Sequence, residues 1–146
     1  YNRRVIFSVH PRTAKRIADL PSKNVHPLVE LGKAMGFHDY VHLQSRASCV
    51  LSDSGTLSEE AALLKFPAVM IRAAHERPEG MDDGVTIQSP ILVDRILNAV
   101  DIAMTQAQSG YRSGDVGDYM KNDVSAKVVR VILSYTDYVN RTIWNR

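Results

Sequence analysis

Residues 51–61 are Leu-Ser-Asp-Ser-Gly-Thr-Leu-Ser-Glu-Glu-Ala, and they indicate the fold more strongly than any other part of the chain. The short apolar run Ser48–Ser52 predicts a buried strand, the small residues Asp53–Gly55 predict a turn, and Thr56–Lys65 predicts a helix. A strand followed at once by a tight turn and a helix is the repeating unit of parallel α/β sheets. We therefore expect a parallel sheet covered by helices.

The same alternation of strands and helices continues on both sides of this stretch. Apolar runs predict a further buried strand at Arg4–Val9 and strands at Val25–Leu31, Ala68–Ile71 and Val85–Gln88. Pro27 weakens the second of these or places it at an edge of the sheet. Helices are expected from a Thr13 cap to about Leu20, over Phe37–Arg46, from a start at Ser89-Pro90, and over about 124–144. Together they predict one Rossmann-like α/β domain over residues 1–146, with helices on both faces of the sheet.

Two of the expected helices have an apolar stripe at helical spacing. In the helix after Ser89-Pro90 the stripe consists of Leu92, Ile96, Ala99 and Ala103. In the last helix it consists of Val124, Val128, Val131, Ile132, Tyr135, Val139 and Ile143. The glycine-rich segment Ser109–Asp118 between these two helices has no such periodicity and is expected to be a loop.

Composition and charge exclude several classes of protein. The chain has 146 residues, of which 45% are hydrophobic and 23% charged, as in ordinary globular domains. Its net charge of +2 is too small to indicate a nucleic-acid or membrane partner. The single Cys49 favours a reducing compartment, no apolar run approaches the ~20 residues of a membrane span, and the start lacks the features of a signal peptide. We expect a soluble cytoplasmic domain whose first strand begins abruptly, as though an upstream part were missing.

The turn at Ser54-Gly55 has the chemistry of a phosphate site. The N-terminus of the following helix presents free backbone N–H groups and the positive end of the helix dipole. Gly55 lets a ligand approach the backbone, and the Ser54 hydroxyl adds a donor. Plain helix capping is the alternative, with Thr56 and Glu59 as a capping box, and for Glu59 we favour this interpretation. Glu60 points about 100° away from Glu59, and its carboxylate suits the hydroxyl groups of a ribose.

Two further groups of polar residues follow predicted strands, where open α/β sheets bind ligands. Arg72 and Arg77 follow Ala68–Ile71 and have the chemistry of a clamp on phosphate oxygens. Glu76 is equally able to pair with either arginine in a surface network, and both interpretations remain open. His10 follows the first strand, where it is suited to donate to a diphosphate or to transfer a proton. A structural role is the more common one for a lone histidine.

Other reactive residue types lack a supporting pattern. His38 and His42 are four residues apart, but the glutamate of the helical zinc motif is absent and no third ligand follows. Cys49 lies in a predicted strand and is expected to be buried and inert. Ser54 is not a hydrolase nucleophile, because the glycine two residues before it is missing. The sequence therefore predicts neither a metal nor another cofactor.

The motifs resemble those of the non-hydrolysing UDP-N-acetylglucosamine 2-epimerases. That family has Ser/Thr-Asp-Ser-Gly-Gly followed by Glu-Glu, and later Glu-Arg-Pro-Glu after a strand. This chain has Ser52-Asp53-Ser54-Gly55-Thr56 with Glu59-Glu60, then Arg72 and His75-Glu76-Arg77-Pro78-Glu79. The ending Ser134–Val139 and the segment Glu76–Met81 look closest to the branch that forms UDP-N-acetyl-L-fucosamine for bacterial surface polysaccharides such as capsule and O-antigen.

The resemblance implies a two-domain fold like that of B-type glycosyltransferases, with this chain as the C-terminal domain and the N-terminal domain absent. It implies that Ser54 and Gly55 hold the diphosphate, Glu60 the ribose, and that Tyr40 lies near the uracil. Arg72 and Arg12 would also bind the UDP-sugar. His10 and Arg77 would reach the diphosphate or leaving group as catalytic residues. The family's His-Arg-Arg-Glu is here His10-Pro11-Arg12-Thr13, and its second glycine is Thr56, which puts the role of Arg12 and the shape of the phosphate site in doubt.

The implied reaction inverts C2 of the sugar by elimination and re-addition of UDP, without a cofactor, in a protein that forms a homodimer when complete. The acid and base carboxylates of the family lie mainly in the absent domain. Three rivals remain at this point: a sugar-nucleotide-binding domain of a B-type glycosyltransferase, a hydrolysing 2-epimerase, and a non-catalytic module that senses nucleotides.

Overall fold

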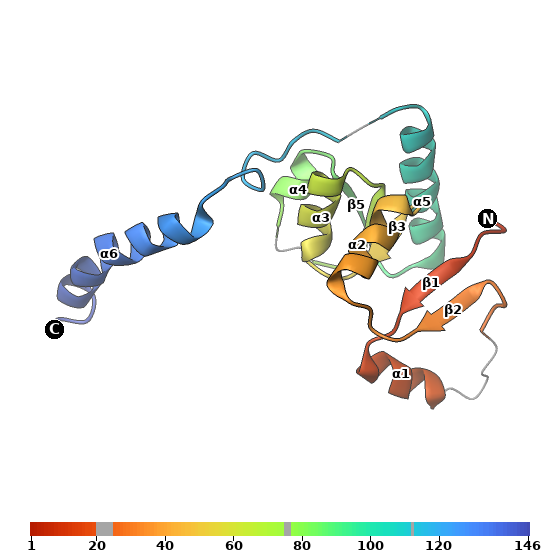
Figure 1. Cartoon of the computed structure of the whole chain (residues 1–146), viewed down its shortest axis with the longest axis horizontal. Coiled ribbons are helices and arrows are strands. Elements are labelled where there is room, and N and C mark those ends of the chain that lie inside the picture. Colours follow the sequence, from red (N-terminus) through yellow and green to blue (C-terminus); the bar gives the residue numbers. More distant parts are fainter. Residues whose placement is uncertain (20–24, 75–76, 112) are drawn as a thin grey trace. The chain divides into compact units, whose positions relative to one another are not determined.

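The computed structural model describes residues 1–19, 25–74, 77–111 and 113–146. The chain divides into two compact units, Tyr1–Ala47 and Ser48–Arg146. Each unit is described below by itself, with the element labels of Figure 1.

The first unit contains a two-stranded parallel sheet and two helices. Strand β1 (Val5–Ser8) pairs with β2 (Val29–Gly32) in the register Val5 to Val29. The helices are α1 (Pro11–Ala18) and α2 (Phe37–Arg46). The expected helix Phe37–Arg46 is therefore confirmed, and the second strand begins two residues after Pro27, which lies outside the ladder.

Two predictions for this unit are wrong. Thr13 does not cap α1, because the helix begins at Pro11 with His10 as its N-cap. Proline suits the first helical position, where its missing N–H costs no hydrogen bond. Strand β1 is also not buried, since its apolar side chains Val5, Ile6 and Phe7 are 38–51% exposed. A two-stranded sheet offers too little surface to enclose a core of its own.

The second unit contains a three-stranded parallel sheet in the order β3-β4-β5. Its strands are β3 (Val50–Ser52), β4 (Ala68–Ile71) and β5 (Thr86–Ser89). Its helices are α3 (Thr56–Leu64), α4 (Glu79–Asp82), α5 (Val93–Gln108) and α6 (Val124–Thr142). The strand–turn–helix unit predicted from residues 48–65 is confirmed as β3 and α3, but β3 begins only at Val50 and is not buried, since Leu51 is 43% exposed.

Helices cover both faces of this sheet, as the sequence predicts, and β4 shows why. Its side chains alternate between faces, as in any strand. Ala68 and Met70 belong to a core with Leu57 and Ala61 of α3. Val69, which is fully buried, belongs to a second core with Ala99, Val100 and Ala103 of α5. Of the predicted stripe, Leu92 stays outside this core and is 60% exposed. One strand is therefore buried from two sides, which explains its continuous apolar sequence.

The start of α5 differs from the prediction. Ser89 is the last residue of β5, and its hydroxyl donates to the carbonyl of Pro90 instead of capping a helix. The helix begins at Val93, with Leu92 as N-cap. Pairing with β4 extends β5 to Ser89, so the chain needs additional residues before it can turn into the helix.

Helix α6 has the predicted length to within two residues, but none of its residues is buried. The members of its apolar stripe from Val124 to Tyr135 are 49–58% exposed. The periodicity correctly predicts the helix, and within the described part of the chain nothing covers its apolar face. No described helix is both long enough and apolar enough to span a membrane.

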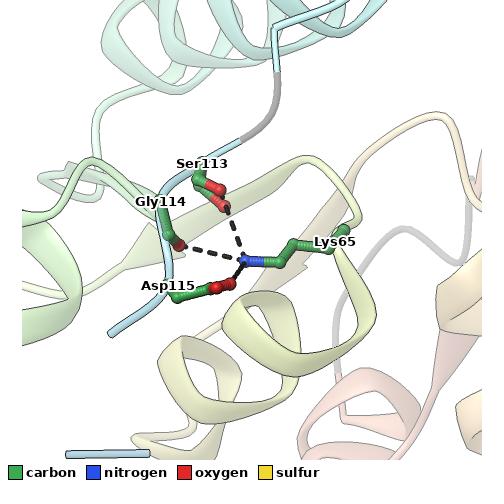
Figure 2. A network of polar contacts seen from close by, with 4 residues as sticks. All are labelled: Lys65, Ser113, Gly114 and Asp115. Atoms are coloured by element: carbon green, nitrogen blue, oxygen red, sulfur yellow. Dashed lines mark hydrogen bonds and ion pairs between the residues drawn. The ribbon is translucent and has the colours of Figure 1, made fainter. Parts of the chain in front are cut away.

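Lys65 ties the end of α3 to the loop that follows α5 (Figure 2). Its ammonium donates to the carbonyls of Ser113 and Gly114 and to Asp115 Oδ1, at 3.3, 3.0 and 2.7 Å. Lys65 is the C-cap of α3 and has a left-handed backbone, φ 58°. This contact holds the loop where Val116, 2% exposed, enters the α3 core.

Candidate functional site

The turn between β3 and α3 is held by its own hydroxyl groups. The Ser54 N–H donates to Ser52 Oγ at 3.1 Å, and the hydroxyls of Ser54 and Thr56 are 3.0 Å apart. Gly55 is the N-cap of α3, and no side chain caps the helix. The predicted capping box of Thr56 and Glu59 is therefore wrong, because Thr56 is already the first helical residue. The N-terminal end of α3 keeps its positive dipole end open to an anion.

Arg77 crosses the first turn of α3. Its Nε donates to Glu59 Oε1 at 2.7 Å, and both side chains are about one-third exposed, 34% and 36%. A side-chain Cβ on Gly55 would collide with Nη1 of Arg77. The backbone of Gly55 is ordinary, with φ −59°. Position 55 therefore needs glycine for space, so that a guanidinium lies directly over the start of the helix.

A small recess lies beside this guanidinium, in the second unit. We call it the α3–α4 recess, and its lining includes Gly55, Ser58, Met70, Arg72, Arg77 and Thr86. It brings together the two arginines that the sequence suggested as a phosphate clamp. Thr86 Oγ1 is buried and has no hydrogen-bond partner among the described residues. The recess thus combines two cations, a helix N-terminus and a buried hydroxyl.

The segment after Arg77 is held by packing and by one tyrosine. Gly80 is buried so closely against α3 that a Cβ there would lie 2.7 Å from Ser58 Cβ. The Tyr119 hydroxyl donates to Glu79 Oε1 at 3.0 Å. Burial and this hydrogen bond to the carboxylate raise the pKa of Tyr119 to about 12. Residues 77–80 therefore have anchors to α3 on one side and to the α5–α6 connection on the other.

Two further predicted residues of this unit, Ser54 and Glu60, do not line the recess. Ser54 is exposed on the turn, and Glu60 is half-buried on α3, one residue after Glu59. His75 and Glu76 are outside the described residues, so the suggested ion pair of Glu76 stays a prediction. Among the described residues, Arg77 pairs with Glu59, which the sequence interpretation assigned to capping.

Three predicted residues, His10, Arg12 and Tyr40, belong to the first unit. His10 caps α1, its Nδ1 accepting from the Arg12 N–H at 3.2 Å. The structural role is thus confirmed, and it has a chemical consequence: a neutral ring that accepts at Nδ1 has its proton on Nε2. His10 can cap the helix and still present a donor. Tyr40 is half-buried on α2.

Comparison with known proteins decides the family. Residues 1–133 match the UDP-N-acetylglucosamine 2-epimerase family. The chain belongs to this family. The UDP-N-acetylglucosamine 2-epimerase of Methanocaldococcus jannaschii is 30% identical over 112 residues, which cover 75% of this chain and 31% of that protein.

Solved structures of the family have the same fold. The structure of the UDP-N-acetylglucosamine 2-epimerase from Rickettsia bellii matches with a TM-score of 0.85 and 48% identity, over all of this chain and 40% of that chain. The M. jannaschii enzyme in complex with UDP-GlcNAc and UDP matches with a TM-score of 0.77 and 26% identity, over 92% of this chain and 36% of that one. The chain thus spans less than half the length of these epimerases.

The family match accounts for the motifs described above. The other residues of reactive type, a cysteine and two histidines, lie outside those motifs. Cys49 is half-buried, not fully buried as predicted. Its partial burial raises the pKa of the thiol to about 11, so the thiol stays protonated at neutral pH. His38 and His42 are exposed on α2. No group of three or more metal-ligating side chains is present among the described residues.

Sequence interpretation missed Thr86 as a lining residue of the recess, Glu59 as the partner of Arg77 and Tyr119 as the partner of Glu79. Thr86 had a signal, a hydroxyl at the start of an apolar strand. Tyr119 had none, because it contacts Glu79 across 40 residues of chain. For Glu59 the sequence indicated a capping role, which does not apply because the helix already begins at Thr56.

Proposed function

We propose that this chain is the C-terminal, nucleotide-sugar-binding domain of a non-hydrolysing UDP-N-acetylhexosamine 2-epimerase. The observation that carries the proposal is the guanidinium of Arg77 lying over Gly55 at the N-terminus of α3, beside Arg72 in the same recess. Two guanidinium groups at a helix N-terminus match the charge and geometry of a diphosphate. The family match and the epimerase solved with UDP-GlcNAc and UDP support the same ligand class.

Each proposed contact follows from the chemistry of one group. Ser54 and the backbone at Gly55 bind the diphosphate together with Arg72 and Arg77. The carboxylate of Glu60, one residue further along α3, accepts hydrogen bonds from the ribose. In the other unit, Tyr40 lies near the uracil, Arg12 binds the UDP-sugar, and His10 donates from Nε2 to the diphosphate or leaving group.

The proposed reaction is an elimination followed by an addition. A base takes the C2 proton, the C2–H electron pair forms a C1=C2 double bond, and the C1–O pair leaves with UDP. Re-addition of UDP at C1 and protonation of C2 from the other face give the epimer with no net oxidation. Because C2–H is not acidic, the departing diphosphate must be strongly stabilised, and Arg77 supplies this stabilisation. The base is expected in the N-terminal domain of the complete enzyme.

The finer assignment extends this proposal. We propose that the complete enzyme is a cytoplasmic homodimer that supplies precursors of bacterial surface polysaccharides such as capsule or O-antigen, in the branch that forms UDP-N-acetyl-L-fucosamine. Product analysis distinguishes it from a hydrolysing enzyme, which would release free sugar and UDP.

Calorimetry of the 146-residue chain tests the proposal. We expect UDP to bind more tightly than uridine, because only UDP presents a diphosphate to the arginines. Arg77→Ala should remove most of this difference. Arg95→Ala removes the same charge from α5, on the opposite face of the sheet, and should leave UDP affinity unchanged. Equal affinity of the wild-type chain for UDP and uridine would contradict a diphosphate site at α3.

A further inference from the structure

The position of Glu59 is unusual for an acidic residue beside a proposed anion site. Glu59 lies four residues after Gly55, so the two share one face of α3. Arg77 spans this turn, with Nε bonded to Glu59 at 2.7 Å and Nη1 over Gly55. The Nε edge of the guanidinium is therefore occupied by the carboxylate, and the Nη edge is directed to the start of the helix.

Stability does not account for this pair. Both side chains are about one-third exposed, and ion pairs of this kind contribute little to folding. The carboxylate also repels a diphosphate bound nearby. Because Glu59 weakens anion binding and adds little stability, we look for its role in fixing the orientation of the Arg77 guanidinium.

We propose that Glu59 is a positioning residue, which holds Nε of Arg77 so that the Nη edge faces the diphosphate leaving group. This inference rests on the proposed function. Arginine has a long flexible stem, and its planar fork is effective only when it is oriented in advance. The diphosphate gains charge as the C1–O bond breaks, so an oriented donor assists the transition state more than the ground state. Glu59 should therefore contribute to kcat more than to binding.

Replacing Glu59 changes UDP binding in two opposite ways, so its effect on binding can be told apart from its effect on kcat. Glu59→Ala removes a repulsive charge, which strengthens UDP binding, and releases Arg77, which weakens it. We expect the Kd for UDP to change less than threefold while kcat of the complete enzyme falls at least tenfold. Glu59→Gln keeps an oxygen acceptor for Nε and should restore most of kcat.

A double-mutant cycle on the complete enzyme tests the link to Arg77. In an Arg77→Lys background there is no Nε–H to orient, so adding Glu59→Ala should lower kcat less than twofold further. The control is Glu30→Ala, which removes an exposed carboxylate that pairs with Nε of Arg4 at 3.2 Å in the first unit and should leave kcat unchanged. A direct readout on the 146-residue chain is the Arg77 Nε–H NMR signal, assigned by its loss in Arg77→Lys; it should be protected from exchange in the wild type and lose protection in Glu59→Ala.

The outcomes separate this inference from the proposed function. A wild-type enzyme that epimerises UDP-sugars while Glu59→Ala retains full kcat would overturn the role of Glu59 alone. Equal losses from Glu59→Ala in the Arg77 and Arg77→Lys backgrounds would overturn it too. A wild-type protein that neither binds UDP nor epimerises UDP-sugars would overturn the proposed function and, with it, the inference.

Discussion

Gly55 lacks a side chain at the point where the guanidinium of Arg77 crosses α3. Its backbone conformation is open to any residue, so the requirement comes from space and not from strain. The contact is decided by a residue 22 positions further along the chain. The candidate site therefore depends on the missing side chain at position 55 as much as on the positive charge of Arg77.

Gly55→Ala should weaken UDP binding by about 10- to 100-fold, the value of one charge-assisted hydrogen bond of about 1.5–3 kcal/mol. The added methyl group displaces Arg77 from the helix N-terminus. The melting temperature should change little, because alanine fits φ −59°. Calorimetry and a melting curve measure the two effects. Gly117→Ala is the matched control, since a Cβ at Gly117 meets nothing within 4 Å; equal UDP affinity in the two variants would contradict the prediction.

Glu60→Gln tests the proposed ribose contact. Loss of a charge-assisted hydrogen bond should weaken UDP binding by about 1–3 kcal/mol. Binding of uracil, which has no ribose, should stay unchanged. Calorimetry with both ligands makes the comparison within one variant, and equal losses for UDP and uracil would exclude a ribose contact.

At the scale of elements, the packing of α4 on α3 places Arg77. Gly80 and Ser58 are in such close contact that only glycine fits at position 80. Tyr119 holds Glu79 from the other side, and Lys65 holds the loop before Tyr119 (Figure 2). The short α4 is thus held by two elements that are distant in sequence.

Gly80→Ala should destabilise the protein by about 1–3 kcal/mol through overpacking against α3. Denaturant unfolding measures the change. Because the clash is with the Ser58 side chain, Ser58→Gly should offset part of the loss, and the double variant should be more stable than the sum of the single changes predicts. Strict additivity would show that the two residues do not press on each other.

The raised pKa of Tyr119 predicts that the stability of the fold depends on pH in the alkaline range. Its pKa is raised from 10.0 to about 12 in the folded protein. Below pH 10 the phenol is protonated in both states, and the hydrogen bond to Glu79 stabilises the fold in full. As the pH rises from 10 towards 12, the unfolded state releases the proton first, so this stability is progressively lost. Tyr119→Phe should be less stable than the wild type at neutral pH, with the gap closing over this range in denaturant unfolding; a gap independent of pH would contradict the assignment.

At the scale of the whole molecule, the chain corresponds to less than half of each solved epimerase that it matches. Its second unit has cores on both faces of its sheet, whereas the apolar stripe of α6 and the strand β1 are exposed. The two arginines and the helix N-terminus that we propose for the diphosphate lie in the second unit, whereas the acid and base carboxylates are expected outside this chain. Binding and catalysis should therefore be separable.

The 146-residue chain should bind UDP weakly and show no epimerisation. Its arginines and helix N-terminus suffice for a diphosphate, but the carboxylates that act at C2 are expected outside residues 1–146. NMR of a UDP-N-acetylglucosamine solution incubated with the chain measures conversion, and a complete family enzyme serves as the positive control. Turnover by the purified chain would show that the base lies within it.

Sequence alone determined the parallel α/β class, the strand–turn–helix unit of residues 48–65, α2, α6 and the motifs of the family. These features depend on local periodicity and turn chemistry, which neighbouring residues specify. Tertiary structure decided that Arg77 pairs with Glu59, that Gly55 makes room for Arg77, and that Tyr119 holds Glu79. It also decided that β5 extends to Ser89 and delays α5. Each of these depends on contacts between residues 18 to 40 positions apart. Their pairing follows from how strands and helices pack, which no local pattern encodes.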